Sequence, residues 1–304
     1  MADARRIMKF LDPKVLKNIN GIEVKARMLV DGMYASRHRC PDYGASVEFV
    51  DHRDYVQGDD PRSIDWKMLA RTEKYYIKRF EMESNMDVTC LLDVSGSMGY
   101  VTDDRNRLTK LEYASYLAAS LAFLMGKQQD AAGLITFDTK MRDFLPPKQG
   151  QRHLFSILSC LNNIQAGGET DLEDVLKLVA QRLTRRGLVV LISDCYGNAE
   201  RVIDGFKHVA GRGQEILVFH IVDDDEINFP FDTLTSFKDL ESGQQVLSDP
   251  LFQRKNYIDR FERFRDEIEE GVAGFGADYR FASTSDPIEI LLRDYLLYRK
   301  ERYK

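Results

Sequence analysis

Two stretches of almost uninterrupted apolar residues constrain the fold of this chain more than any other feature. They are residues 188–192 and residues 216–222, the second interrupted only by His220. A strand exposed on one face alternates apolar and polar residues, whereas a central strand of a parallel sheet is covered on both faces and is apolar throughout. The two runs therefore predict an α/β fold with a mostly parallel central sheet and helices on both faces.

Segments with apolar residues at helical spacing separate further strand candidates, as a layered α/β architecture requires. Helices are expected at residues 108–125, 151–161, 172–183 and 257–270, with a final helix opened by Asp286-Pro287. Additional strands are expected at residues 131–137, 141–145 and 279–282, and a hairpin at residues 235–241 and 244–247, around Ser242-Gly243.

A third apolar run, residues 90–92, stops at Asp93 and is followed by Ser95 and Ser97 with glycines beside them. This pattern predicts a buried strand that opens into a loop and turns three oxygen-bearing side chains toward one point. Oxygen donors favour Mg²⁺, Mn²⁺ or Ca²⁺ over zinc. The stretch is therefore a candidate metal-binding loop.

The spacing of Asp93, Ser95 and Ser97 is similar to the metal-ion-dependent adhesion site (MIDAS) of von Willebrand factor type A domains. The MIDAS pattern continues with a threonine and an aspartate on two later loops. Thr170 follows Gly167-Gly168, and Asp194 follows the apolar run at residues 188–192. The resemblance implies a Rossmann-like von Willebrand factor type A domain that binds Mg²⁺, Mn²⁺ or Ca²⁺, with Thr170 and Asp194 acting directly or through water.

Thr170 and Asp194 each have a structural alternative. Thr170 with Glu173 three residues later matches a helix capping box, in which the threonine hydroxyl satisfies a backbone N–H. Asp194 taken alone would be a helix cap or a turn residue. The double glycine before Thr170 and the order of both residues after Asp93 favour the metal role.

A second resemblance lies in residues 47–81, which include Gly58-Asp59-Asp60 and Ile64-Asp65-Trp66. This stretch is similar to the signature of the bacterial family catalogued as domain of unknown function fifty-eight, whose members carry a von Willebrand factor type A domain immediately afterward. The resemblance implies a chaperone-like role with a MoxR-type AAA+ ATPase.

The two resemblances predict two domains. Residues 1–85 are expected to form an N-terminal helical segment and the family-signature module, and residues 86–304 the von Willebrand factor type A domain. The module is expected to dock on the sheet domain, with Trp66 buried.

Composition narrows the classes of partner and location. The net charge of −6 argues against nucleic acid, which requires a clustered basic surface. Four cysteines without a C-x-x-C pair indicate reduced thiols and neither a zinc nor a disulfide framework. The longest apolar stretch, residues 116–125, is too short to span a membrane, so a cytoplasmic location is expected.

The chain lacks the motifs of common enzyme classes. It has no phosphate-binding G-x-x-x-x-G-K-[ST] loop, no dinucleotide fingerprint and no G-x-S-x-G nucleophile elbow. A magnesium-dependent hydrolase or phosphatase using Asp93 is the enzymatic alternative, but it expects an acid where Ser95 stands. The sequence therefore predicts a non-enzymatic protein that binds a protein partner, whose acidic residue completes the coordination of the metal.

Overall fold

A computed structural model describes residues 21–36, 49–54, 64, 66–72, 74–80, 86–101 and 107–302. The chain divides into two compact units, Met1–Cys40 together with Met86–Lys304, and Pro41–Asn85. The division expected from the sequence is also placed at residue 86. Helix α3 (Ile22–Ser36) differs from that expectation, because it belongs to the sheet unit: Ala26, Leu29 and Met33 lie in the same core as the central strand.

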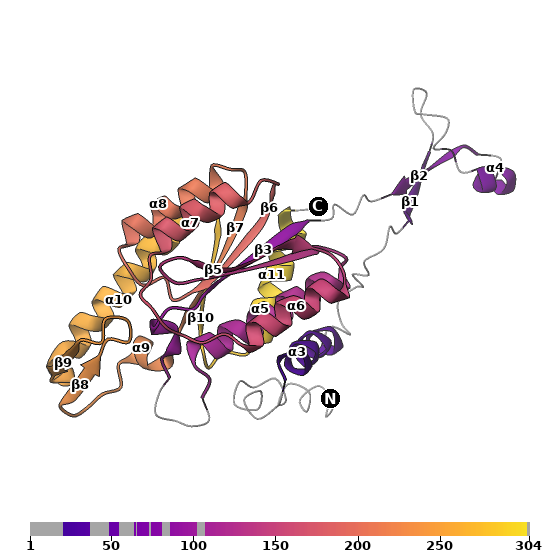
Figure 1. Ribbon diagram of the computed structural model, residues 1–304. Coiled ribbons are helices and arrows are strands. Elements are labelled where there is room, and N and C mark those ends of the chain that lie inside the picture. The colour runs from indigo at the N-terminus through magenta and orange to yellow at the C-terminus, as the bar shows by residue number, and fades with distance from the viewer. Residues whose placement is uncertain are drawn as a thin grey trace. The chain divides into compact units, whose positions relative to one another are not determined.

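The larger unit is built on a six-stranded sheet of order β10-β7-β6-β3-β4-β5 (Figure 1). All neighbouring pairs are parallel except β4 and β5, which are antiparallel. The strands are β3 (Asp87–Asp93), β4 (Ala131–Phe137), β5 (Met141–Lys148), β6 (Gly187–Ser193), β7 (Glu215–Val222) and β10 (Asp278–Ser283). The prediction of a mostly parallel sheet with buried central strands is confirmed.

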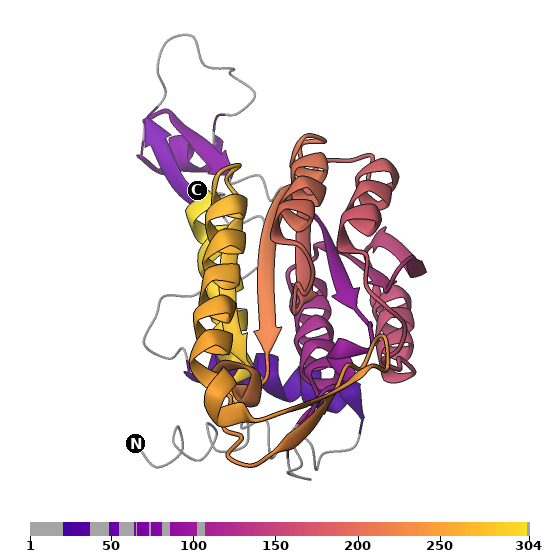
Figure 2. The same cartoon turned by 90° about the vertical axis from the view of Figure 1, so that its left-hand side faces the viewer.

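Helices cover both faces of this sheet, as the apolar runs predict (Figure 2). Helices α3, α5 (Lys110–Lys127), α6 (Gln151–Asn162) and α11 (Ile288–Arg302) share one core with the sheet. Helices α7 (Leu172–Arg182), α8 (Ala199–Ala210) and α10 (Pro250–Ala273) share the other. Adjacent residues of β3 point to opposite cores, Leu91 to the second and Leu92 to the first, because side chains alternate along a strand.

Helix α8 is absent from the sequence-based expectation, although its apolar residues Val202, Phe206 and Val209 have helical spacing and Asn198 caps its first turn. Helix α10 begins at Pro250, seven residues before the expected start. The Asp249 side chain accepts the Leu251 N–H at 3.1 Å, which is an N-cap with proline in the first turn.

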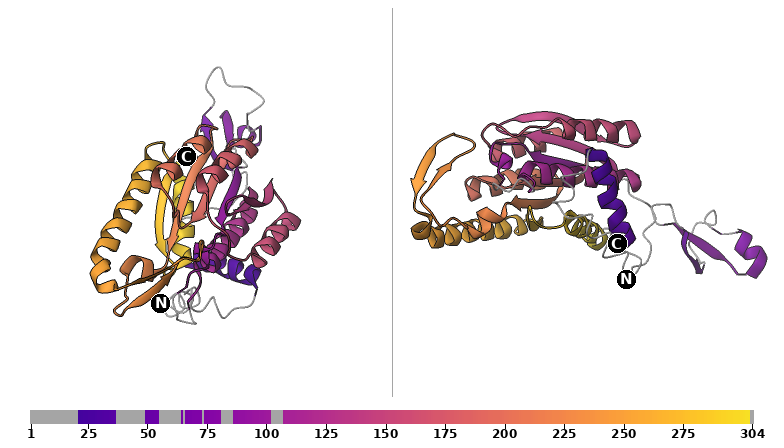
Figure 3. Two further views of the ribbon diagram at one scale, coloured as in Figure 1. Left: turned by 60° about the vertical axis from the view of Figure 1, so that its left-hand side comes forward. Right: turned by 90° about the horizontal axis from the view of Figure 1, so that it is seen from below.

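The predicted hairpin is present as β8 (Thr235–Lys238) paired with β9 (Gln245–Ser248). It lies at the end of the sheet toward which the parallel strands point (Figure 2). Figure 3 shows that it projects from the amino-terminal end of α10. The hairpin therefore lies at the same end of the sheet as the loops that follow β3 and β6.

The smaller unit contains an antiparallel pair, β1 (Phe49–Asp54) with β2 (Tyr76–Phe80), and helix α4 (Trp66–Thr72). Within this unit the expected burial of Trp66 is not found, because its side chain is 61% exposed. Trp66 is the first residue of a seven-residue helix whose remaining described side chains are exposed or only partly buried. Such a short helix offers too little apolar surface to enclose an indole.

The exposure of Trp66 predicts its fluorescence, which is the only tryptophan fluorescence of the chain. Emission should resemble that of a solvated indole and should be quenched by iodide. Replacement Trp66→Ala should change the free energy of unfolding by no more than about 0.5 kcal/mol, as is usual for surface positions. A blue-shifted emission shielded from iodide would contradict the exposed position.

Candidate metal centre

Asp93, the last residue of β3, is completely buried. Its Oδ2 accepts the Ser193 hydroxyl at 2.6 Å, and its Oδ1 accepts the Ser95 N–H at 2.9 Å. Both donors are neutral, and Asp93 makes no ion pair with any described residue. The pKa of Asp93 is raised to about 7, mainly by burial and secondly by the nearby charge of Asp194. The two hydrogen bonds act in the opposite direction and lower the pKa, but by less.

Ser95 and Ser97 point toward each other, with their hydroxyl oxygens 3.0 Å apart. Ser97 opens the short 3₁₀ turn η2 (Ser97–Gly99), and the neighbouring Met98 is fully buried in the core. Met98 therefore anchors the turn that presents Ser97. The hydroxyls of the two serines that follow Asp93 therefore lie together.

The loop that carries Thr170 is tied to the Asp93 loop by two backbone hydrogen bonds. Gly167 donates to the Val94 carbonyl at 2.9 Å, and Gly96 donates to the Gly168 carbonyl at 2.8 Å. These bonds bring the second predicted loop alongside the first.

Thr170 does not cap helix α7, so the alternative interpretation of Thr170 as part of a capping box is excluded. The cap is Asp171, whose side chain accepts the Asp174 N–H at 3.2 Å. The Thr170 hydroxyl instead donates to Glu241 Oε1 at 3.2 Å.

Asp138 and Arg142 hold the double-glycine turn from the other side. Arg142 Nε donates to Asp138 Oδ2 at 2.6 Å, and Arg142 Nη2 donates to the Gly167 carbonyl at 2.7 Å. Asp138 is 5% exposed, and burial would raise its pKa. The hydrogen bonds from Arg142 and from the Lys140 N–H, together with the charge of Arg142, outweigh burial and lower the pKa of Asp138. The pair therefore fixes the turn that precedes Thr170.

Gly168 predicts a position-specific loss of stability. Its φ is +86°, and an added Cβ would lie 2.9 Å from Asp138 Oδ2. Gly168→Ala should therefore lower the free energy of unfolding by about 1–3 kcal/mol. Gly167→Ala is the matched control, because nothing lies within 4 Å of its added Cβ and its φ is outside the left-handed region. Equal urea midpoints for the two variants would contradict the strain at Gly168.

Asp194 follows β6, the neighbour of β3 in the sheet. The register pairs Leu92 with Ile192, so Asp93 and Asp194 lie at the same edge, as the sequence predicts. Asp194 Oδ1 accepts the Tyr196 N–H at 3.3 Å. Its Oδ2 accepts from Lys110 Nζ at 2.7 Å. Asp194 is therefore already paired with a cation.

Lys110 also donates to Glu226 Oε1 at 2.7 Å, and its side chain is 0% exposed. Burial alone would lower the pKa of Lys110, but the charges of Asp194 and Glu226 outweigh burial and raise it. The lysine is thus a buried cation between two carboxylates. Of the two carboxylates of the site, Asp194 is paired with Lys110, whereas Asp93 has no cationic partner among the described residues.

The donor set suits a hard divalent cation. It consists of the buried carboxylate of Asp93, the hydroxyls of Ser95 and Ser97, and, on adjacent loops, Thr170 and Asp194. Oxygen donors of this kind suit Mg²⁺. Within the described ranges, no group of three or more histidine, cysteine, aspartate or glutamate side chains could hold a metal. The candidate site depends on hydroxyls for more than half of its donors.

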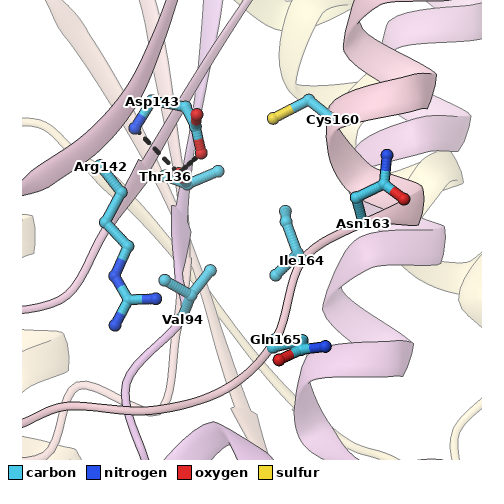
Figure 4. Close-up of a pocket in the computed structure, with 8 residues that line it drawn as sticks. All are labelled: Val94, Thr136, Arg142, Asp143, Cys160, Asn163, Ile164 and Gln165. Atoms are coloured by element: carbon cyan, nitrogen blue, oxygen red, sulfur yellow. Dashed lines mark hydrogen bonds between the residues drawn. The ribbon is translucent and has the colours of Figure 1, made fainter.

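A cleft of about 390 Å³ lies beside the metal loop (Figure 4). Figure 4 shows Cys160, Asn163, Ile164 and Gln165 on one side, and Thr136, Arg142 and Asp143 on the other, with Val94 at its base. None of the five candidate ligands lines it. Val94 connects the cleft to the metal loop, but the site and the cleft are separate features.

Sequence reasoning missed the groups that support the five candidate residues. Ser193 was detectable, because it directly precedes Asp194 and carries a hydroxyl to the end of an apolar strand. Lys110 lies in helix α5, Glu226 in the short helix α9 (Asp224–Asn228) and Glu241 in the hairpin turn, and no local pattern marks these three residues. Of the cysteines, Cys90, Cys160 and Cys195 are free thiols as expected, and Cys40 lies outside the described residues.

Comparisons with known proteins identify a family and several similar chains. The family model described as "Protein of unknown function DUF58" matches residues 51–268. An uncharacterized protein of Mycobacterium tuberculosis is 24% identical over 273 residues, which cover 88% of this chain and 84% of the relative.

Among solved structures, the von Willebrand factor type A (VWA) domain of SpRpn10 is 13% identical with a TM-score of 0.39, and the match covers 69% of this chain and 95% of that one. An aerotolerance-related membrane protein from Bacteroides fragilis is 18% identical with a TM-score of 0.45, and the match covers 70% and 99%.

The expected cytoplasmic location is corrected by these comparisons. A structural neighbour from Bacteroides fragilis is described as a membrane protein, which contradicts the expectation, and that assignment is withdrawn. None of the described helices combines the length and the hydropathy that a membrane crossing requires.

The sheet order, the single antiparallel edge strand and the helices on both faces make this a von Willebrand factor type A-like fold. The match of residues 51–268 covers more than half of the chain. The chain therefore belongs to the family described as "Protein of unknown function DUF58".

Proposed function

We propose that this protein binds a protein partner through a divalent cation, Mg²⁺ or Mn²⁺, held by Asp93, Ser95, Ser97, Thr170 and Asp194. The observation that carries the proposal is the state of Asp93. Its carboxylate is completely buried, and its hydrogen-bond donors are a serine hydroxyl and a backbone N–H. A buried charge without a counter-ion is unfavourable, and a divalent cation bound at this position would compensate it.

The division of charge at the site favours an acidic partner. Lys110 contacts Asp194 and Glu226 at 2.7 Å each, and its positive charge offsets one of their two negative charges. If Asp93 is the only carboxylate bound directly, the cation keeps net positive charge, because the other donors are neutral hydroxyls. A glutamate or aspartate of the partner would then complete the coordination, and the surrounding loops would supply the remaining contact area.

The proposed role is one of binding, and catalysis is not part of it. A phosphatase that used Asp93 as nucleophile would need a second acid two residues later, and the residue there is Ser95. Ser95 instead pairs with the Ser97 hydroxyl at 3.0 Å.

A MoxR-type AAA+ ATPase, or a client of such an ATPase, is the proposed class of partner. The choice of this partner class is supported by the family resemblance of residues 47–81, and it does not depend on any contact within the chain. It can fail without affecting the metal site.

The test is capture of partners from an extract of the native cell on immobilised protein. Wild type is compared in excess Mg²⁺ and in excess EDTA, with Asp93→Ala as the site variant and Asp259→Ala, an exposed aspartate on α10, as the control. Proteins retained by wild type and Asp259→Ala only in Mg²⁺, and lost with Asp93→Ala, support the proposal. A retained set that is the same in EDTA and with Asp93→Ala would overturn it.

A further inference from the structure

The turn of the β8–β9 hairpin is closed by hydrogen bonds, and Glu241 projects from it. Asp239 organises the turn: its N–H donates to the Gln244 carbonyl at 2.8 Å, and its carbonyl accepts the Gly243 N–H at 2.9 Å. The Asp239 side chain also accepts the Glu241 N–H at 2.8 Å. These bonds fix the direction in which Glu241 leaves the turn.

Glu241 reaches from this turn to the candidate metal centre. Its Oε1 accepts the Thr170 hydroxyl and its Oε2 accepts the Thr170 N–H, both at 3.2 Å. The carboxylate thus engages the hydroxyl that the proposed function assigns to the metal. Glu241 makes no ion pair with any residue in the described part of the chain.

A second contact places the same turn against the Asp93 loop. The Leu240 carbonyl oxygen lies so close to Gly96 that an added Cβ on Gly96 would be 2.5 Å from it. Gly96 stands between Ser95 and Ser97, and its N–H donates to Gly168. The hairpin turn therefore touches both loops of the site, 71 residues after Thr170 in the chain.

The hairpin is also an element that can leave this position. Val246 and Leu247 of β9 are 62% and 66% exposed, and β8 and β9 form a separate two-stranded sheet. Phe237 of β8 packs on Phe229, with ring centroids 5.4 Å apart, which anchors the base of the hairpin. A two-stranded hairpin adds little further stability by itself, so its turn can open at low free-energy cost while the base stays packed.

We propose that Glu241 is an internal acidic ligand of the metal centre, which competes with the acidic residue of an external partner. In the closed state the chain's own carboxylate serves the open position of the cation. In the open state the hairpin turn withdraws, and a carboxylate from the partner takes that position. This inference rests on the proposed function, because it requires the divalent cation at Asp93, Ser95 and Ser97.

Competition of this kind has a definite consequence for affinity. A ligand on the same chain acts at an effective concentration on the order of millimolar, so a free carboxylate must overcome it before it binds. Loss of the internal ligand should therefore tighten the binding of an external carboxylate and expose the metal to more water.

The test uses the full chain loaded with Mn²⁺ and acetate as the external carboxylate. Relaxation of water protons by bound Mn²⁺ reports the number of water molecules on the metal, and its decrease on titration reports acetate binding. The variants are Glu241→Gln, which removes the charge, and Glu241→Asp, which keeps the charge but shortens the side chain. Glu262→Gln, at an exposed glutamate on α10, is the control.

Both Glu241 variants should raise the water-proton relaxation of bound Mn²⁺ and tighten acetate binding by about fivefold or more, the lower end of typical coupling between sites. Glu262→Gln should match wild type. If both Glu241 variants match wild type, or only Glu241→Gln differs, the internal ligand is refuted while metal binding stands. If wild type binds no Mn²⁺, the proposed function itself fails.

Discussion

Replacement of Asp93 by alanine should abolish Mg²⁺ binding, with a loss of affinity of more than about 100-fold. Groups that only support the ligands of a metal are worth about 10–100-fold in affinity, and Asp93 is the buried carboxylate on which the proposed site depends. Isothermal titration calorimetry of Mg²⁺ into the metal-free chain measures this loss. Circular dichroism of the variant verifies that the fold is retained.

The matched control for this prediction is Asp259→Ala, which removes a carboxylate from the exposed surface of α10. Its Mg²⁺ affinity should equal that of wild type. If Asp93→Ala also retains wild-type affinity, the Mg²⁺ that binds is held elsewhere, and the assignment of the site is wrong.

Replacement of Lys110 by methionine should destabilise the fold by about 3–5 kcal/mol, because it leaves Asp194 and Glu226 as buried charges without their cation. Lys110 is 0% exposed and Asp194 is 1% exposed, so water cannot take over the role of the ammonium group. Urea unfolding, followed by circular dichroism, measures the change in free energy of unfolding.

Two further variants make the Lys110 result specific. Lys177→Met breaks the partly exposed pair of Lys177 with Glu173, four residues apart on α7, and should change stability by only about 0.3–0.5 kcal/mol. The double variant Lys110→Met with Asp194→Asn should recover part of the loss, because it removes one of the stranded charges. A Lys110→Met protein as stable as Lys177→Met would contradict the buried ion-pair network.

The fold was predictable because its strongest signals are local. Residues 188–192 and 216–222 are apolar because β6 and β7 are covered on both faces. Strands buried in this way require a layer of helices on each side of the sheet. Helix α8 was overlooked despite its regular spacing. Trp66 was misjudged because an aromatic side chain indicates burial only when enough surrounding chain exists to enclose it.

The site was predictable in part, for a similar reason. Asp93, Ser95 and Ser97 belong to one loop, and Asp194 ends a neighbouring strand, so sheet topology alone brings them to one edge. Lys110 and Glu241 could not be placed in this way, because their contacts span 84 and 71 residues of sequence and depend on side-chain direction. The competing role of Thr170 as a helix cap was decided only by the hydrogen bonds of Asp171 and Glu241.

Anomalous diffraction from crystals grown with Mn²⁺ will show whether one divalent cation binds at Asp93, Ser95 and Ser97. One strong anomalous peak is expected at the carboxyl end of β3, with Asp93, Ser95 and Ser97 oxygens at about 2.1 Å, close to the length of a Mg²⁺–oxygen bond. A well-ordered site with no peak there, or a peak bound by other residues, would contradict the account.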